Sequence, residues 1–321
     1  MTTQQTNSLP GNITFPVLKN FYDVIIHREA LIRAVNDQPM MDFVYHFPHL
    51  FTNTFRTTSD RIITPEADAL LNEKFNWCIA GSAALHHIHS HLRQAFNNLK
   101  EMEKTREENL VKLINTLKLN RGSLTIEQFI EFIKNNKEFI SQRLSSESLM
   151  ELDTIINSYC NEKLPDTFSD ISLNTSYNDV DIFFLNSPVS CRMQIGHTDI
   201  VHSTCKTVDE LLLNFDLPCC RVSMNSKHDY YISAQCLYAL LTNEYPLPNY
   251  VQDRDSFISL LKNHRNGDPM RVSEEFLYQR ILERIKKYKQ RGFNVVWYKT
   301  DYVLPWIQNR FHYGEWKQIT P

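Results

Sequence analysis

Polar and apolar residues alternate between positions 178 and 185, where the chain reads NDVDIFFL. Asp179 and Asp181 alternate with apolar residues just before a short apolar run. A period of two is typical of a β-strand, which would place both carboxylates on one face. Two neighbouring carboxylates repel each other and favour a divalent cation between them. The alternative is a polar strand entrance that binds no metal.

A second apolar run, NWCIA at 76–80, predicts a short strand that ends abruptly at Gly81 and Ser82. The following residues, AAL at 83–85, favour a helix. Glycine lets a ligand approach the backbone closely, and a hydroxyl beside the free N–H groups of a new helix can face an anion. The pattern indicates a phosphate-binding turn at Gly81 and Ser82. The alternatives are an ordinary strand end and a helix cap made by Ser82.

Residues 90–163 are charged and have helical periodicity. Apolar stripes with helical spacing occur at 110–117 and 126–133, and the second is preceded by the capping-box pair Thr125 and Gln128. Acidic and basic residues are interspersed, which is typical of a solvated helix surface. We interpret this segment as a helical insertion.

After Pro165 the pattern mixes strands and helices. Asp216 falls near the start of one predicted strand, at 215–224, and would be a third acid in the sheet. Predicted strands are at 179–185, 199–203, 215–224, 230–232 and 293–298. Over the whole chain, helices are predicted at 16–32, 64–74, 146–159, 208–214, 234–243 and 273–291. The N-caps of the last three are Thr207, Ser233 and Ser273. The two prolines in 244–250 predict a loop there.

Composition limits the classes of protein that fit. The chain has 321 residues, 42% of them hydrophobic, which is enough for a packed core. A net charge of −3 implies no global attraction to nucleic acid, and 7 glycines without a Walker A or G-x-G-x-x-G pattern argue against those phosphate loops.

The domains that we expect are a flexible tail at 1–13, an α/β core at 14–89 and 164–245, a helical insertion at 90–163 and a helical C-terminal region at 246–321.

The cysteines and the apolar runs indicate in which cellular compartment we expect the protein. The seven cysteines form no C-x-x-C pair and lie mostly in apolar runs, which predicts reduced, buried thiols. No apolar run approaches the ~18 residues that a membrane span needs. The first ten residues also lack the pattern of a signal peptide. We therefore expect a cytoplasmic protein with no membrane partner.

Three predicted features point to the same chemistry. They are the turn at Gly81 and Ser82, the acid pair Asp179 and Asp181, and the later acid Asp216. Three carboxylates on neighbouring strands can hold two Mg²⁺ (or Mn²⁺) ions, which favour a few carboxylates together with substrate phosphates. The turn can hold the phosphates that those ions also bind. For Asp216 the alternative role is that of a turn or cap residue.

This set of residues resembles the motif of the nucleotidyltransferase superfamily, the polymerase-β-like enzymes. That motif combines a Gly-Ser turn, an acid-x-acid strand and a third acid on an adjacent strand. Residues 75–88 and 171–245 carry the resemblance best, and 215–220 also resemble uncharacterised fungal and large-DNA-virus members. The resemblance implies an α+β fold with a nucleotidyltransferase-like mixed β-sheet core flanked by helices. It also implies that Asp179 and Asp181 bind both metals, that Asp216 activates the acceptor hydroxyl, and that Ser82 contacts the triphosphate.

The activity that this resemblance implies is transfer of a nucleoside monophosphate from ATP or another NTP to an acceptor hydroxyl, with release of pyrophosphate. The acceptor would be RNA, a protein or a small molecule. The resemblance also makes a virus-infected host cell a conceivable setting. The alternative is a catalytically inactive module of the same fold that binds a protein or RNA partner through the helical insertion and the basic residues of 280–291. A third, weaker reading is an RNA-binding or RNA-modifying protein without this fold.

Two other groups of residues have less specific patterns. Histidines occur at 86, 87, 89 and 91, and His87 and His91 share a helix face. They lack an H-E-x-x-H arrangement, so we expect hydrogen-bonded or exposed side chains and not a zinc site. Cys219 and Cys220 are interpreted as packing residues, and a cysteine nucleophile is the less favoured alternative because no partner can be assigned.

Overall fold

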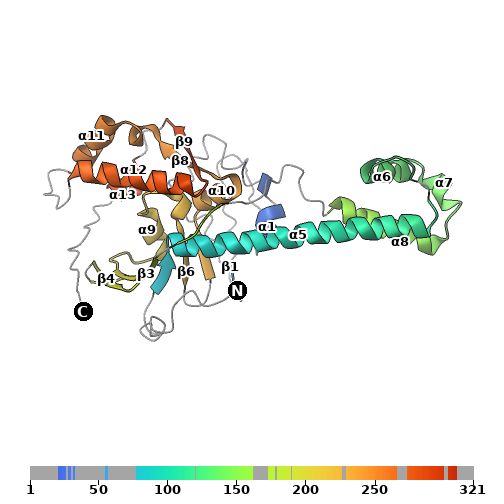
Figure 1. Cartoon of the computed structure of the whole chain (residues 1–321), viewed down its shortest axis with the longest axis horizontal. Helices are drawn as coiled ribbons and strands as arrows, with labels where there is room; N and C mark the ends of the chain where they lie inside the picture. Colours follow the sequence, from blue (N-terminus) through green and yellow to red (C-terminus); the bar gives the residue numbers. More distant parts are fainter. Residues whose placement is uncertain are drawn as a thin grey trace, which may run out of the picture. The chain divides into compact units, whose positions relative to one another are not determined.

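The computed structural model describes residues 21–26, 28–29, 32, 55–56, 77–119, 121–161, 173–177, 179–188, 190–225, 229–265, 273–299 and 303–308. The predicted tail at 1–13 and the predicted helix at 64–74 lie outside these residues. The chain divides into two compact units, Met1–Leu92 with Ile171–Pro321 and Arg93–Asp170 (Figure 1). Helix α5 (Ser82–Thr116) contributes residues to both units.

The first unit contains a mixed β-sheet. In the described residues the sheet has seven strands, in the order β1-β7-β6-β2-β3-β5-β4. Strands β3 and β5 are parallel, and the other described neighbours are antiparallel. This mixed sheet with helices agrees with the predicted α+β class. The strands are β1 (Phe55–Arg56), β2 (Trp77–Ala80), β3 (Val180–Phe184), β4 (Cys191–Ile195), β5 (Thr198–His202), β6 (Val222–Asn225) and β7 (Asp229–Ile232).

Strand β2 lies at the centre of the core. All four of its residues are buried, and the fully buried Ile79 lies opposite Ile182 of β3 and Met224 of β6. Burial of such a side chain stabilises the fold by about 1.5–3 kcal/mol. The apolar run predicted at 76–80 is therefore a core strand, and its end fixes the position of the turn at Gly81.

The strand register brings the predicted site residues together. Ala80 of β2 lies opposite Asp181 of β3, and Asp181 in turn lies opposite Asp199 of β5. Gly81 follows Ala80 directly, so the turn begins one residue after the residue that pairs with Asp181. Asp179 precedes β3 by one residue. The segments that the sequence separates are thus neighbours in the sheet.

Helices of the first unit begin largely where the cap residues predict. The hydroxyls of Thr207, Ser233 and Ser273 accept hydrogen bonds from the N–H groups of the first turns of α9, α10 and α12. Gly292 has a φ of +96° and follows the end of α12, as expected for a residue at C′. The helices are α1 (Phe21–Ile26), α9 (Val208–Leu213), α10 (Ala234–Thr242), α11 (Arg254–Arg265), α12 (Glu274–Gln290), α13 (Pro305–Gln308) and the short 3₁₀ turns η2 (Pro218–Cys220) and η3 (Asn249–Val251).

The strand predicted at 215–224 is wrong in its first half. The Asp216 carboxylate accepts a hydrogen bond from the Leu217 N–H at 2.9 Å, which favours a turn. Pro218 has no N–H for a sheet ladder and begins η2. The Arg221 guanidinium also donates to the Phe215 carbonyl, at 3.1 and 3.2 Å, which holds the loop closed. Asp216 consequently lies in a loop, and only β6 remains as strand.

The loop predicted at 244–250 is also wrong. Residues Glu244–Pro248 form β8, which pairs in parallel with β9 (Asn294–Tyr298) as a separate two-stranded sheet. Pro246 and Pro248 are two residues apart, so both nitrogen atoms can point away from β9, the neighbour of β8 among the described strands. A proline signal therefore does not exclude a strand whose prolines face away from the strand it pairs with.

The second unit is helical, as the pattern at 90–163 predicts. It contains the later part of α5 together with α6 (Ile126–Asn135), α7 (Lys137–Ser141) and α8 (Ser146–Asn161). The capping box before α6 is present with both of its hydrogen bonds, and the predicted apolar stripe of α6 is buried. These side chains form an apolar cluster with residues of α5 and α8, including Leu110, Leu113 and Leu152. The unit thus has a core of its own.

Candidate functional site

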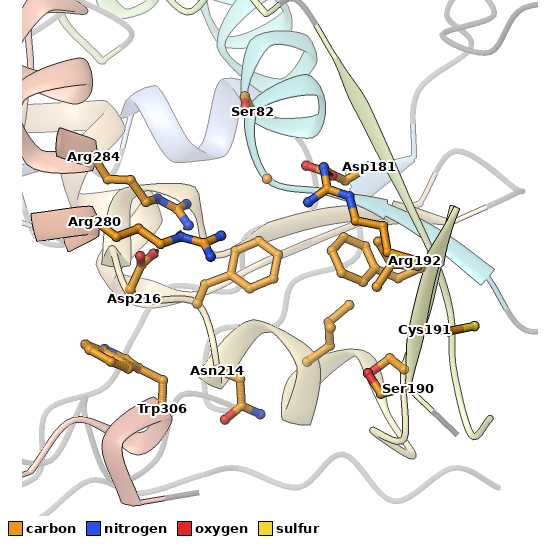
Figure 2. A pocket seen from close by; sticks show the side chains of 16 residues that line it. Ser82, Asp181, Ser190, Cys191, Arg192, Asn214, Asp216, Arg280, Arg284 and Trp306 are labelled. Carbon is orange, nitrogen blue, oxygen red and sulfur yellow. Dashed lines mark ion pairs between the residues drawn. The ribbon is translucent and has the colours of Figure 1, made fainter. Parts of the chain in front are cut away.

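A pocket of about 220 Å³ lies in the first unit, at the turn that follows β2. One part of its lining is polar and the other part is apolar and aromatic. The charged lining residues come from β3, β4, the loop before η2, and α12 (Figure 2). The polar lining includes Ser82, Asp181, Arg192, Asp216, Arg280 and Arg284, and the apolar lining includes Phe183, Val201, Leu211, Phe215 and Trp306.

Gly81 brings the backbone close to the acid strand. Its φ is +79°, and a Cβ atom at this position would lie 3.9 Å from Asp181 Oδ2 and 3.5 Å from Phe215 Cε2. The Gly81 N–H donates to the Val222 carbonyl at 3.1 Å, so it already has a partner in the sheet. Donors for an anion would come from the first turn of α5, which begins at Ser82, because the first N–H groups of a helix have no intrahelical partner.

Three carboxylates come together beside this turn. Asp179, Asp181 and Asp199 each offer an oxygen atom, and these atoms lie within 4.8 Å of one another. Asp199 is only 1% exposed, and its Oδ1 has no hydrogen-bond partner among the described residues. Burial raises the pKa of Asp181, and the nearby Arg192 guanidinium partly opposes this effect. Buried, unsatisfied carboxylate oxygens are suitable ligands for a hard cation, so this group could hold a metal ion.

Asp199 is a site residue that the sequence patterns do not assign. Its strand is predicted, but the single acid at the start of that strand has no acid-x-acid signature. The only local signal is that Asp199 is followed by Ile and Val, much as Asp181 is followed by Ile and Phe. The parallel pairing of β3 with β5 gives this acid its place beside Asp181.

Asp216 lines the same pocket but does not join the carboxylate cluster among the described residues. Its Oδ1 forms an ion pair with Nη1 of Arg284 at 3.0 Å, and its side chain is 14% exposed. Its role as a metal ligand stays a prediction. In this structure it is the counter-charge of an arginine on α12.

Arg192 of β4 pairs with the carboxylate cluster. Its Nη2 forms an ion pair with Asp199 and lies 3.7 Å from Oδ1 of Asp181. The sequence patterns predict neither strand β4 nor this contact. Figure 2 shows Arg192 and Asp181 on one side of the pocket, with Arg280, Arg284 and Asp216 on the other.

Helix α12 supplies the second group of positive charges. Arg280 and Arg284 are four residues apart, so they share one helix face, and both line the pocket (Figure 2). The Arg284 guanidinium also lies 3.6 Å from Cys220 Sγ. A hydrogen bond from Cys219 and the charge of Arg284 lower the pKa of Cys220, although the thiol is fully buried. A buried thiol outside the pocket lining does not support the reading of Cys220 as a nucleophile.

The histidine group on α5 is hydrogen-bonded and packed, as expected. The Thr175 hydroxyl lies 3.3 Å from His86 Nδ1 and 3.2 Å from His89 Nδ1. His91 stacks on Phe21 with ring centroids 5.6 Å apart. Within the part of the chain that the structure describes, these histidines do not form a group of three potential metal ligands. The contacts of His86 and His89 with Thr175 hold the segment before β3 against α5.

The same segment is fixed from α12. Arg291 donates through Nη2 to the Ser176 carbonyl at 2.6 Å, and its own carbonyl accepts from the Asn174 N–H at 3.0 Å. Arg291 is 9% exposed. These contacts precede Asp179 by a few residues, so they position the start of the acid strand.

Comparison with protein-family models, with curated proteins and with solved structures finds no match to this chain. The class of the protein therefore rests on the fold and the site themselves: an α+β chain whose mixed sheet brings an acidic cluster next to a strand–glycine–helix turn. In the described part of the chain, none of the helices has the length and apolar character needed to cross a membrane.

Proposed function

We propose that this chain is a nucleotidyltransferase-fold enzyme that transfers a nucleoside monophosphate from an NTP to an acceptor hydroxyl. The observation that carries the proposal is the register of β2 and β3. Ala80 lies opposite Asp181, so the turn at Gly81 and Ser82 begins beside the acid strand although Asp179 comes 97 positions after Ser82 in the sequence. A phosphate held at the start of α5 would therefore lie next to the carboxylates.

The carboxylate cluster fits Mg²⁺ or Mn²⁺. Its donors are all carboxylate oxygen atoms, and the Oδ1 atom of Asp199 is buried without a partner among the described residues. Bound divalent ions would neutralise phosphate oxygens and lower the pKa of the attacking hydroxyl. The protein itself holds one carboxylate oxygen each of Asp179, Asp181 and Asp199 within 4.8 Å of one another. Asp199 thus takes the place beside the acid pair that the sequence resemblance gives to Asp216.

The phosphate chain of an NTP would be held from two directions. On one side are the Ser82 hydroxyl and the N–H groups of the first turn of α5. On the other side are the guanidinium groups of Arg280 and Arg284, which reach the pocket from α12 (Figure 2). Arginine binds phosphate through two parallel N–H donors, so it fixes orientation as well as charge.

The apolar part of the pocket would receive the nucleobase. Phe215 and Trp306 line it, and aromatic rings bind bases by stacking. The indole Nε1 of Trp306 is buried and has no hydrogen-bond partner among the described residues. A ligand group that accepts a hydrogen bond would satisfy this donor. The acceptor substrate is a hydroxyl of RNA, a protein or a small molecule.

The proposal is tested by isothermal titration calorimetry with each NTP and Mg²⁺, together with an assay of NTP consumption. The Asp179→Ala/Asp181→Ala double variant should lose Mg²⁺-dependent consumption of NTP. The control is Asp209→Ala, since Asp209 is an acidic residue of α9 outside the pocket lining. Consumption by the double variant at the wild-type rate would place the chemistry elsewhere.

A second candidate is an inactive module of the same fold that binds a protein or RNA partner. The observation that favours it is the pairing of the acids: Arg192 pairs with Asp181 and Asp199, and Arg284 pairs with Asp216. A chain that no longer binds metal could neutralise its acids in this way. Calorimetry separates the two candidates, because the inactive module would bind no NTP at any concentration of Mg²⁺ or Mn²⁺.

A further inference from the structure

Arg192 lies where a cation on the carboxylate cluster would lie. Its Nη2 contacts Asp199 and approaches Asp181 Oδ1 to 3.7 Å, and these two acids belong to the group whose ligand atoms are within 4.8 Å of one another. An arginine side chain keeps its charge at all ordinary pH values. While it stays in this position, the guanidinium therefore offsets one negative charge of the cluster.

The position of Arg192 on β4 would let its side chain move away without opening the core. Among the described strands, β4 is at the end of the sheet order and pairs with β5 alone. The Arg192 side chain is 31% exposed, whereas that of Asp199 is 2% exposed. Rotation of the long arginine side chain about its own bonds would thus release the acids without moving the strand.

A second set of partners for Arg192 would arrive with the substrate. Arg192 lines the same pocket as Ser82, Arg280 and Arg284, which we assign to the phosphate chain (Figure 2). Phosphate oxygens, like carboxylates, bind a guanidinium, often through two parallel hydrogen bonds. A metal–nucleotide complex therefore supplies a metal ion that can replace Arg192 at the carboxylates. It also supplies phosphates with which the displaced Arg192 can form an ion pair.

We propose that Arg192 is a positioning residue that competes with the metal ion for Asp181 and Asp199, and that it transfers to the phosphates when nucleotide binds. This inference rests on the proposed function. Its consequence is that metal and nucleotide bind cooperatively. A metal ion that binds alone must displace Arg192 from Asp181 and Asp199, and Arg192 then loses its ion pairs. When nucleotide binds as well, Arg192 forms new ion pairs with the phosphates. By linkage, nucleotide raises metal affinity by the same factor by which metal raises nucleotide affinity.

The test measures the binding of Mn²⁺ to the full chain by the electron paramagnetic resonance signal of the free ion, first without nucleotide. Arg192→Gln should bind Mn²⁺ at least about tenfold more tightly than wild type, since it removes the competing charge. The matched control is Arg254→Gln, an exposed arginine that pairs with Asp255 and Glu275 on α11 and α12. This control loses the same charge and should bind Mn²⁺ as wild type does.

The second measurement repeats the titration with a non-hydrolysable NTP analogue. Nucleotide should strengthen Mn²⁺ binding to wild type by at least about tenfold, and the gain should be at least several times smaller in Arg192→Gln. If Arg192→Gln does not fold, Arg192→Lys serves in its place. Lysine keeps the charge but loses the planar fork, so its Mn²⁺ affinity without nucleotide should lie above that of wild type.

The outcomes separate this inference from the function on which it rests. Equal Mn²⁺ affinity of wild type and the Arg192 variant would overturn the competition even if the protein consumes NTP. Tighter Mn²⁺ binding by the variant, with no nucleotide binding by either protein, would support the competition and overturn the proposed transferase and the transfer of Arg192 to phosphate. Absence of Mn²⁺ binding by both proteins under both conditions would overturn the competition and the metal site together.

Discussion

Asp181 and Asp199 lie opposite each other at one register position of the parallel strands β3 and β5. Side chains at paired positions of neighbouring strands point to the same face of a sheet. Asp181 therefore has one acidic neighbour, Asp179, two residues away on its own segment and a second, Asp199, across the strand pair. The carboxylate cluster is a property of the sheet order and not of the acid-x-acid motif alone.

This arrangement predicts which acids bind metal. In the presence of a non-hydrolysable NTP analogue, Asp199→Asn should weaken Mn²⁺ binding more than tenfold, or more than about 1.4 kcal/mol, because it removes a buried ligand charge. Asp216→Asn should weaken it by less than about threefold, since Asp216 pairs with Arg284 and lies outside the cluster among the described residues. Mn²⁺ titrations monitored by electron paramagnetic resonance give both values. The reverse ranking would restore Asp216 as the third metal ligand.

Local patterns identify the parts of the site that are continuous in sequence. The acid strand, the turn at Gly81 and Ser82, and the helix caps all depend on a few neighbouring residues, and the structure contains each of them. The strand at 215–224 fails because side-chain hydrogen bonds of Asp216 and Arg221 compete with the sheet ladder there. Apolar periodicity does not report such bonds.

The remaining site residues depend on contacts between distant segments. Asp199 becomes a candidate ligand only because β5 pairs with β3, and Arg192 reaches the acids only because β4 pairs with β5. Arg280 and Arg284 belong to the basic residues of 280–291, whose pattern fits a solvated helix face or a surface for an anionic partner, and tertiary packing places them in the pocket. No spacing rule in a single sequence reports strand order, so Asp199 and Arg192 could not be assigned from it.

The arginines of α12 give a second prediction. Arg280→Gln should weaken NTP binding by about tenfold, because it removes a charge that would pair with phosphate. Lys286→Gln is the control, since Lys286 is exposed on the same helix and does not line the pocket. Calorimetry at two salt concentrations should show a weaker salt dependence for Arg280→Gln than for wild type. Equal losses in both variants would indicate a general charge effect of the helix.

Arg291 gives a prediction about stability. It donates at 2.6 Å to the Ser176 carbonyl and lies over the Tyr288 ring at 5.0 Å, and it is 9% exposed. Arg291→Gln should lower the free energy of unfolding by about 1–3 kcal/mol, the cost of losing a buried, charge-assisted hydrogen bond. Urea denaturation measures this change, and the exposed Arg254→Gln should change it little. A stability loss without weaker Mn²⁺ binding would show that Arg291 supports the fold but does not position Asp179.

Gly81 gives the sharpest test of the turn, because another glycine of this chain has a similar backbone conformation. Gly81 has a φ of +79° and Gly122 a φ of +59°, so alanine at either position should cost ~1 kcal/mol of conformational strain. The surroundings differ. A methyl group at Gly81 would lie 3.9 Å from Asp181 Oδ2, whereas one at Gly122 would have no atom within 4 Å.

The two variants should therefore differ in binding and not in strain. Gly81→Ala should weaken NTP binding by about tenfold or more, since its methyl group would occupy the space between the start of α5 and the carboxylates. Gly122→Ala should leave NTP binding unchanged while thermal unfolding shows a comparable loss of stability. Wild-type affinity in Gly81→Ala would mean that phosphate is not held at this turn. Equal losses of affinity in both variants would mean that backbone strain, and not the approach to the acids, determines binding.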